Sequence, residues 1–319
     1  MKKSFINTVH VEGVLYEHNL ELKTSGPKSK NPGTEYISGS IKVATDDEIT
    51  NIVDIYYTYV TAVTATGKTN SAFSTLKNII NETAKTYMKH GKDKAALVRI
   101  DAAMNVNDFY TDRNNSGTPE LVSAKRYEGG FIHIVNEICL PTDEKGLKRN
   151  NFKTDMIITN CRRVEANEEK GLKERVIVKG YIFNFAKNLM PVEFATFDEK
   201  AMDYFESLDA SINNPTFTKV WGPQVSEVVK TEREVESAFG DSYVETSTST
   251  RKEFVITGAN PEPYVWDDES TLTVNELQEM LANREIHLAE VKTRFEEYKQ
   301  ANSTPTPVAV SNSKEDFKF

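Results

Sequence analysis

The chain has 319 residues, a formal net charge of −9 at pH 7, and 38% hydrophobic and 10% aromatic residues. This hydrophobic share excludes a fully disordered chain, and the sequence contains no apolar run of the length that a membrane-spanning helix needs. The acidic balance disfavours a protein that coats duplex DNA by charge alone. Cys139 and Cys161 give neither a disulfide framework nor a zinc spacing, so we expect two half-buried thiols in a reducing cytosol, no metal and no cofactor.

Alternation of apolar and polar residues predicts five strands in the first half of the chain. A helical period predicts one amphipathic helix over Asn70–His90, ending at Gly91, between the third and fourth strands. The strands are expected over Asn7–Thr24 with a bend at Gly13, Tyr36–Thr45, Ile52–Ala65, Ala95–Asn105 and Leu121–Val135. Five strands with a helix in this place are typical of the OB-fold, a small Greek-key barrel.

The same order returns after a basic, turn-prone join, so we expect a second barrel with its own helix over Glu199–Leu208. Its strands are expected over Phe152–Val164, Arg175–Phe185, Pro191–Phe197, Phe217–Val229 and Tyr243–Ile256. The sequence therefore predicts a mainly β protein with two tandem OB-fold-like five-stranded barrels, each with one helix between strands 3 and 4. The expected boundaries are 1–144 for the first barrel, 145–150 for a linker and 151–262 for the second barrel.

The last part of the chain predicts one long helix and a disordered acidic tail. Thr273 and Glu276 have the spacing of a capping box, and apolar residues then recur at intervals of three and four, which predicts a helix within 271–300. This helix either docks on the second barrel or pairs with another copy of the chain. Residues 301–319 lack a period and are expected to be disordered.

Three short motifs resemble bacterial and phage single-stranded-DNA-binding proteins. The motifs are the opening strand at 7–15, the second strand at 41–45, and a later strand at 96–100 followed by the aromatic segment 105–110. The resemblance covers roughly residues 5 to 137, and it implies an OB-fold that binds single-stranded DNA. The chain's end, with Glu315, Asp316, Phe317 and Phe319, is similar to the acidic and aromatic tip of that family, which implies that the tail recruits replication or recombination proteins.

Binding a single strand requires flat rings on which bases stack and cations that follow the phosphates. Tyr56 and Tyr57 point to opposite sides of their strand, so one of them should be exposed. Each ring has an alternative place in a barrel core, and each cation an alternative as a solvated surface charge. The predicted nucleic-acid-binding residues are Lys28, Lys30, Tyr36, Lys42, Tyr57, Tyr59, Arg99, Phe109, Tyr110, Lys125, Arg126, Lys148, Arg149, Arg162, Arg163, Lys179, Tyr181, Phe183 and Trp221.

No catalytic motif is present: the sequence has no P-loop, no dinucleotide-binding glycine pattern and no His-Glu-x-x-His. We therefore expect a non-enzymatic, sequence-tolerant single-stranded DNA-binding protein of replication, recombination or repair, in the cytoplasm of a bacterium or a phage-infected cell. RNA as the bound strand, and self-association through the long helix, stay open. The alternative is an OB-type protein-interaction or phage virion assembly module that binds no nucleic acid.

Overall fold

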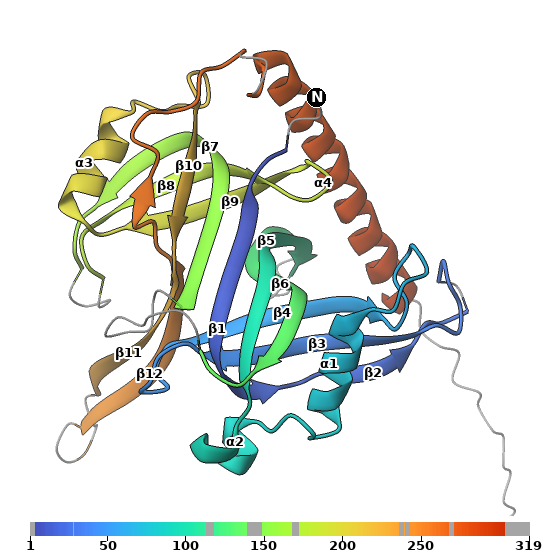
Figure 1. Ribbon diagram of the computed structural model, residues 1–319. Helices are drawn as coiled ribbons and strands as arrows, with labels where there is room; N and C mark the ends of the chain where they lie inside the picture. The colour runs from blue at the N-terminus through green and yellow to red at the C-terminus, as the bar shows by residue number, and fades with distance from the viewer. Residues whose placement is uncertain are drawn as a thin grey trace, which may run out of the picture.

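The computed structural model describes residues 4–27, 29–112, 118–138, 149–167, 172–235, 239, 243–267 and 271–303. The protein is mainly β (Figure 1). The strands are β1 (Asn7–His18), β2 (Glu21–Thr24), β3 (Glu35–Ala44), β4 (Ile52–Thr61), β5 (Leu97–Thr111), β6 (Glu120–Val135), β7 (Asn150–Val164), β8 (Arg175–Phe183), β9 (Leu189–Thr196), β10 (Thr216–Gly222), β11 (Gln224–Val235), β12 (Tyr243–Phe254) and β13 (Gly258–Ala259). The helices are α1 (Ser71–Ile80), α2 (Tyr87–His90), α3 (Glu199–Ser207) and α4 (Val274–Ser303), with a 3₁₀ turn at Lys92–Lys94. None of the helices in these ranges is both long and apolar enough to cross a membrane.

The first barrel consists of β1, β3, β4, β5 and β6, and its pairing order is that of an OB-fold. β1 pairs antiparallel with β3 through one part of its length and with β5 through another. β3 pairs with β4, β5 pairs with β6, and a short parallel pairing of β4 with β6 closes the sheet. A parallel contact between the third and fifth strands is what turns five mostly antiparallel strands into a closed Greek-key barrel.

The second barrel repeats this order with β7, β8, β9, β10 and β13. β7 pairs with both β8 and β10, β8 pairs with β9, and β10 pairs with β13. Closure again comes from a parallel contact, here the bridge between Ala195 of β9 and Val255 just before β13. α3 lies between the third and fourth strands of this barrel, as the sequence predicts.

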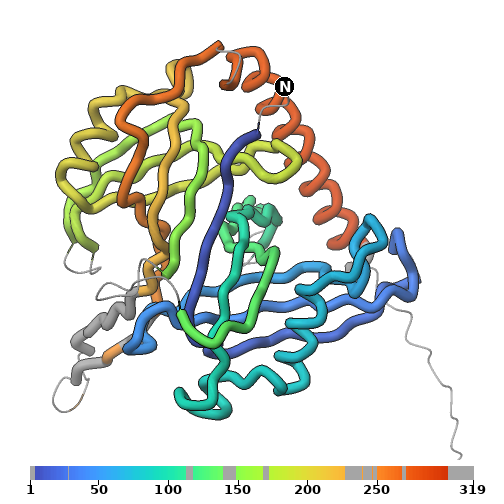
Figure 2. Tube along the Cα trace, in the orientation of Figure 1, coloured from blue at the N-terminus to red at the C-terminus, as the bar shows by residue number. Residues whose placement is uncertain are grey.

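The two barrels join through their first strands. Asn7 to Val11 of β1 pair antiparallel with Thr154 to Asn150 of β7, which makes one continuous sheet of both barrels. Figure 2 shows this blue strand running beside the green one where the barrels meet. Under the junction, Phe152 is fully buried, and its ring centroid lies 5.0 Å from that of Phe194 and 6.1 Å from that of Phe254.

Each barrel also reaches across to the other with the hairpin that connects its fourth and fifth strands. The β5–β6 hairpin extends to β9, where Lys125 Nζ donates to the backbone carbonyl of Glu193. The β11–β12 hairpin extends the opposite way to β4, where Lys252 pairs with Asp54. Because β4 and β9 are the third strands of their barrels, the two hairpins make a reciprocal clasp.

The helix expected over Asn70–His90 is divided into α1 and α2. Its first part begins as expected, with Asn70 Oδ1 accepting from Ala72 N at 3.1 Å. It ends because Glu82 adopts the left-handed conformation, with φ 58°, and Thr83 N donates to Asn78 O at 2.9 Å. This is a Schellman ending, which usually has glycine where this chain has Glu82, so no residue type at this position indicates that the helix ends.

α4 docks on both barrels of its own chain. The capping box is confirmed: Thr273 N donates to Glu276 Oε2 at 2.9 Å, and Glu276 N donates to Thr273 Oγ1 at 3.2 Å. The first turns bury Leu277 in a cluster on the outer face of the second barrel. The helix then runs along the side of the molecule toward the first barrel (Figure 1). There Arg284 makes two hydrogen bonds to Asp108 of β5, at 2.5 and 2.6 Å. Self-association through the apolar residues of this helix would require the helix to leave these contacts.

We expect Gly129→Ala to destabilise the first barrel. A Cβ at Gly129 would lie 2.3 Å from Cζ of the buried Tyr57 ring. Overpacking of this kind lowers the free energy of unfolding by about 1–3 kcal/mol. Urea denaturation measures it, and the control is Gly26→Ala, because no atom lies within 4 Å of a Cβ at Gly26. Equal stability of the two variants would contradict the placement of Tyr57.

We expect Arg284→Ala to lower the free energy of unfolding by about 3–5 kcal/mol, because it leaves a buried carboxylate without its partner. The Asp108 side chain is 2% exposed and that of Arg284 10%. Burial raises the pKa of Asp108, but the hydrogen bonds from Arg284 and Ser123 outweigh burial and hold the pKa below its usual range.

The stabilisation is therefore present above the ordinary aspartate pKa of about 3.9 and is lost as the pH falls through the lower, folded-state pKa. Thermal unfolding at neutral and acidic pH measures this, with the exposed Arg294→Ala on the same helix as the control. A difference between the two variants that persists unchanged in acid would argue against the ion pair.

Candidate functional site

Three tyrosine side chains lie together on the outside of the first barrel. Along β4, Ile55 and Tyr57 point into the core, so Tyr56 points outward. A register shift between β3 and β4 then places Tyr59 on the outer side as well, near Tyr36 of β3. We call Tyr36, Tyr56, Tyr59 and the neighbouring Arg126 of β6 the tyrosine face.

The rings of this face are held by neighbours but keep an open side. The centroids of Tyr36 and Tyr59 are 4.5 Å apart, and the hydroxyl of Tyr59 lies 3.1 Å from that of Ser25. The guanidinium of Arg126 lies 5.6 Å from the Tyr56 ring centroid. Tyr56 is 38% and Tyr59 49% exposed, so both offer surface to a ligand. Burial, followed by the charge of Asp54, raises the pKa of Tyr56, so this side chain stays a neutral phenol at physiological pH.

β3 and β4 are the second and third strands of the first barrel, and these two strands carry the usual binding surface of OB-folds. In the second barrel the corresponding strands are β8 and β9. Their outer side carries the ion pair of Lys179 with Glu193, at 2.8 Å, and Tyr181, which lines a hollow beside the first turns of α4. The tyrosine face is therefore a property of the first barrel.

Two predicted stacking residues are buried, and those predictions are wrong. Tyr57 is 2% exposed inside the first barrel, and Tyr56 on the opposite side of the strand is the exposed member of the pair. Phe183 is 1% exposed because the ring of Phe5 stacks on it at 3.9 Å. Tyr181 and Phe183 lie on the outer face of their strand, but the chain covers that face with its own N-terminal residues and α4.

The other predicted aromatic residues are half-buried. Tyr110 lies 6.1 Å from Phe295 of α4, centroid to centroid, and therefore contributes to helix docking. Trp221 packs over Gly258, where a Cβ would lie 2.3 Å from the indole nitrogen. Phe109 is half-buried near the end of β5.

Most of the predicted phosphate partners have a carboxylate or carbonyl partner of their own. Arg163 is held by three acidic residues, Glu174, Asp203 and Glu206. Lys125 donates to a backbone carbonyl, and burial lowers its pKa. Further pairs are Lys42 with Glu17 at 2.7 Å, Arg99 with Glu12 at 2.6 Å, Arg149 with Asp47 at 2.9 Å, Lys179 with Glu193 at 2.8 Å and Arg126 with Glu128 at 3.7 Å.

Arg126 is a predicted cation that lies over an exposed ring, but that ring belongs to Tyr56, which is not among the predicted residues. Lys30 and Arg162 are exposed at other places on the surface. The remaining predicted residues, Lys28, Lys148, Glu315, Asp316, Phe317 and Phe319, lie outside the described residues.

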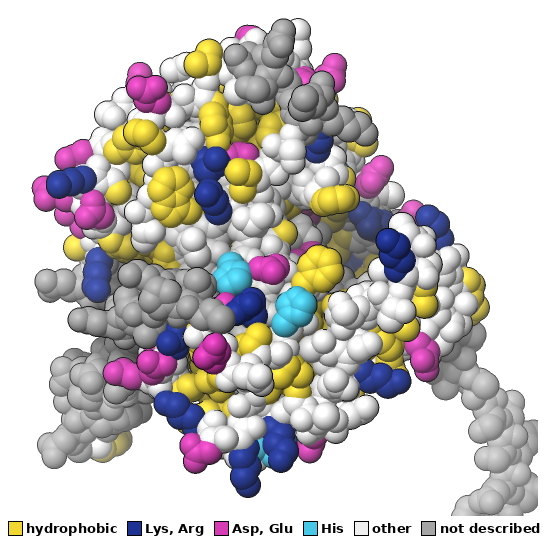
Figure 3. Space-filling model, in the orientation of Figure 1, with side chains coloured by type: hydrophobic (Ala, Val, Ile, Leu, Met, Phe, Trp, Pro, Cys, Tyr) yellow, Lys and Arg dark blue, Asp and Glu magenta, His cyan; other side chains and the backbone are white. Residues whose placement is uncertain are grey.

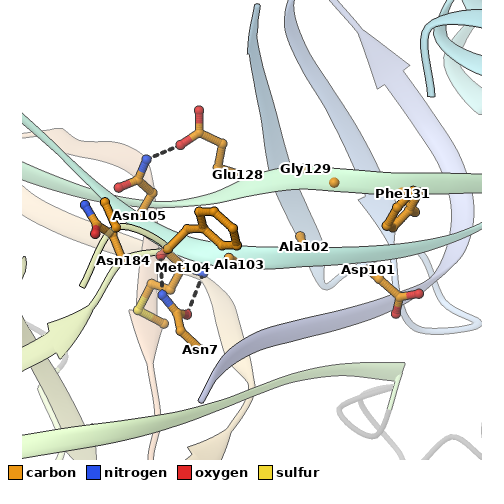
Figure 4. Close-up of a pocket in the computed structure, with 13 residues that line it drawn as sticks. Asn7, Asp101, Ala102, Ala103, Met104, Asn105, Glu128, Gly129, Phe131 and Asn184 are labelled. Carbon is orange, nitrogen blue, oxygen red and sulfur yellow. Dashed lines mark hydrogen bonds between the residues drawn. The ribbon is translucent and has the colours of Figure 1, made fainter. Parts of the chain in front are cut away.

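Sequence reasoning missed a hollow of about 580 Å³ beside the tyrosine face. It lies where the first barrel meets the turn between β8 and β9. Its lining includes the exposed side chains of Phe131 and Phe185. The signal in the sequence was weak: Phe131 directly follows two glycines, Gly129 and Gly130. Figure 4 shows Phe131, Glu128 and Asn105 around this space.

Charged side chains gather near the middle of the face seen in Figure 3, where histidine, acidic and basic groups are neighbours. His10 of β1 lies 2.8 Å from Asp101 and 3.3 Å from the buried carboxylate of Glu12. Arg99 donates to the same carboxylate. Within the described ranges, no cluster of three or more His, Cys, Asp or Glu residues has the geometry to hold a metal ion.

Comparison with known proteins finds a matching family and matching solved structures. A protein family described as YorF matches residues 6–294. Among solved structures, one match is a deletion mutant of the single-stranded DNA binding protein from Thermus aquaticus, with 10% sequence identity and a TM-score of 0.45. The match covers 84% of this chain and 100% of the other. No curated protein matches the chain.

Proposed function

The chain belongs to the YorF family, and we propose that it binds single-stranded DNA on the tyrosine face of the first barrel, without catalysing a reaction. The observation that carries this proposal is the position of two exposed tyrosine rings on the outer side of the first barrel: Tyr56, with a guanidinium over it, and Tyr59, beside the half-buried Tyr36. Stacking on such rings contributes about 1–3 kcal/mol per base and tolerates any sequence.

The geometry favours an unpaired strand over a duplex. Tyr36 and Tyr59 lie close together on a β surface, and a base can stack on them only if it is not already stacked in a double helix. The net charge of −9 also leaves little of the non-specific attraction by which basic proteins coat duplex DNA. Rings supply the main contact, and Arg126 supplies a cation beside them.

The second barrel and α4 hold this surface in place in our proposal. The reciprocal clasp fixes β4, the strand of Tyr56 and Tyr59, against the β11–β12 hairpin of the second barrel. A rigid platform loses less conformational entropy on binding than a mobile one. We further propose a role in replication, recombination or repair in a bacterial or phage-infected cytoplasm. The acidic and aromatic tip at the chain's end would then recruit partner proteins.

We expect Tyr56→Ala and Tyr59→Ala each to weaken binding of a dT oligonucleotide of about 30 nucleotides by roughly tenfold, because each removes one stacking surface. A fluorescence titration measures the affinity. The matched control is Tyr298→Ala, because Tyr298 is 70% exposed on α4. Unchanged affinity in both face variants would remove the tyrosine face from the proposal.

We also expect the affinity of the wild-type protein for the dT oligonucleotide to fall as salt is raised from about 50 to 200 mM, since phosphate contacts release counterions. The fall should be shallow, because the face contains one cation among three rings. Repeating the titration at several salt concentrations measures the slope. No binding even at low salt would contradict DNA binding and favour a protein-interaction module.

A further inference from the structure

The hollow beside the tyrosine face is formed by both barrels. Its first-barrel side is the surface of β5 and β6, and its second-barrel side is the turn after β8, at residues 184–186. The volume of about 580 Å³ falls in the range of pockets that hold small organic ligands. Nothing in the strand-binding role proposed above uses this space.

The side chain of Asn7 lines the hollow and hydrogen-bonds to the backbone of both barrels. Asn7 Nδ2 donates to the carbonyl of Met104 at 2.9 Å and to that of Phe183 at 2.8 Å. Its Oδ1 accepts from Met104 N at 3.0 Å, as the dashed lines in Figure 4 show. Because Met104 belongs to the first barrel and Phe183 to the second, this amide fixes the two sides of the hollow relative to each other before any ligand arrives.

The rim carries two exposed phenylalanines, one from each barrel. Phe131 of β6 is 62% exposed, and Phe185 is fully exposed at 107%. Phe185 stands on a hydrogen-bonded turn, in which Asn188 N donates to Asn184 Oδ1 at 2.9 Å and Asn184 N donates to Asn188 O at 3.0 Å. An aromatic ring presented to solvent by an ordered turn offers a flat face on which a planar ligand can stack, and Phe131 offers a second ring from the first-barrel side of the same hollow.

A carboxylate supplies the polar contact. Glu128 lines the hollow, and its two oxygens accept one hydrogen bond each, from Thr58 Oγ1 and Asn105 Nδ2. An ionised carboxylate has about four acceptor positions, so each oxygen can accept one more hydrogen bond. Two parallel acceptors with fixed neighbours match a planar group that offers two adjacent N–H donors.

We propose that this hollow binds the base of one guanine nucleotide, with Glu128 accepting from its Watson–Crick edge and Phe131 and Phe185 beside its faces. Guanine carries the N1–H and N2–H donors side by side. Adenine and cytosine place a ring nitrogen acceptor beside their amino group, and thymine places carbonyls on both sides of its N–H, so in each of them an acceptor would face a carboxylate oxygen.

The hollow and the tyrosine face are contiguous. A strand bound to the tyrosine face could therefore also place a base in the hollow, so the proposed function would include a preference for guanine. Glu128 is the register partner of Tyr56 where β4 and β6 run parallel. A strand stacked on the tyrosine face therefore passes beside the hollow and can place one base in it. This inference rests on the proposed function for the strand, but the binding of a free nucleotide does not.

A cationic side chain is the alternative to guanine as a ligand, because aromatic rings and a carboxylate also attract a positive charge. Both carboxylates of the hollow already have a basic neighbour: Arg126 lies 3.7 Å from Glu128, and His10 lies 2.8 Å from Asp101. These neighbours reduce the attraction for a further cation, whereas a neutral base with two donors still fits.

Calorimetry with mononucleotides tests the hollow by itself. The full-length protein should bind dGMP about tenfold more tightly than dAMP, dCMP or dTMP, the discrimination expected of one bidentate contact. Glu128→Gln should abolish this preference, because an amide offers one acceptor and one donor. Glu120→Gln, at an exposed position on the same strand, should keep the preference. Equal binding of all four mononucleotides, or no binding of any, would overturn the inference.

A second titration connects the hollow to the strand. A dT oligonucleotide with one central dG should bind about tenfold more tightly than the all-dT strand, and Phe185→Ala should reduce this ratio toward one. Phe185 is fully exposed, so its removal leaves the fold intact.

The two proposals fail in distinguishable ways. Binding of dGMP without binding of either strand would contradict the strand-binding function and support the hollow. Equal affinity for both strands, together with no dGMP preference, would contradict the hollow and leave the tyrosine face standing. Binding of free arginine that depends on Glu128, in place of dGMP, would overturn the inference in favour of a cation site.

Discussion

The pairing of β1 with β7 is the interaction on which the rest of the molecule depends. Five residues of each strand share one ladder, and the buried Phe152 packs directly beneath it against Phe194 and Phe254. Without this ladder, Asn7 would not reach both Met104 and Phe183, and the side of the hollow formed by the second barrel would not face β5. The shape of the hollow is therefore set by a contact between the barrels as much as by either barrel.

The two barrels have the same strand order but different surfaces. In the first barrel, the outer side of the second and third strands is open and rich in tyrosine. In the second barrel, the comparable region is partly covered by Phe5 and α4, and it contributes packing. The same strand order therefore carries two different outer surfaces, and in our proposal one barrel presents the binding surface while the other supports it.

The sequence predicted the order of the five strands of the first barrel, the first three strands of the second barrel and α3, because alternation and turn residues are local signals. The capping box at Thr273 and Glu276 was visible for the same reason. The prediction was wrong at the end of the second barrel. The strand expected over Phe217–Val229 is divided into β10 and β11, and the strand expected over Tyr243–Ile256 is β12, which pairs with β11, whereas β10 pairs with β13. The end of α1 at Glu82 could not be predicted. The residue there has a left-handed backbone conformation, which usually falls on glycine, and no residue type indicates it when glycine is absent. Alternation also placed Tyr56 and Tyr57 on opposite sides but gave no means of choosing the inner one. That choice depends on Gly129, which lies 72 positions later and makes room for the Tyr57 ring. The β1–β7 ladder and the Phe5 contact were equally invisible, because both join segments far apart in the chain.

The reciprocal clasp has a consequence for synthesis of the protein on the ribosome. When the first barrel has emerged, the edge of β1 at Asn7–Val11 and the Asp54 side chain of β4 still lack their partners, which belong to a segment that is not yet translated. An open strand edge can pair with a neighbouring nascent chain. Slow translation between the two halves would therefore favour entanglement of copies on one polysome, and prompt arrival of β7 protects each chain from its neighbours.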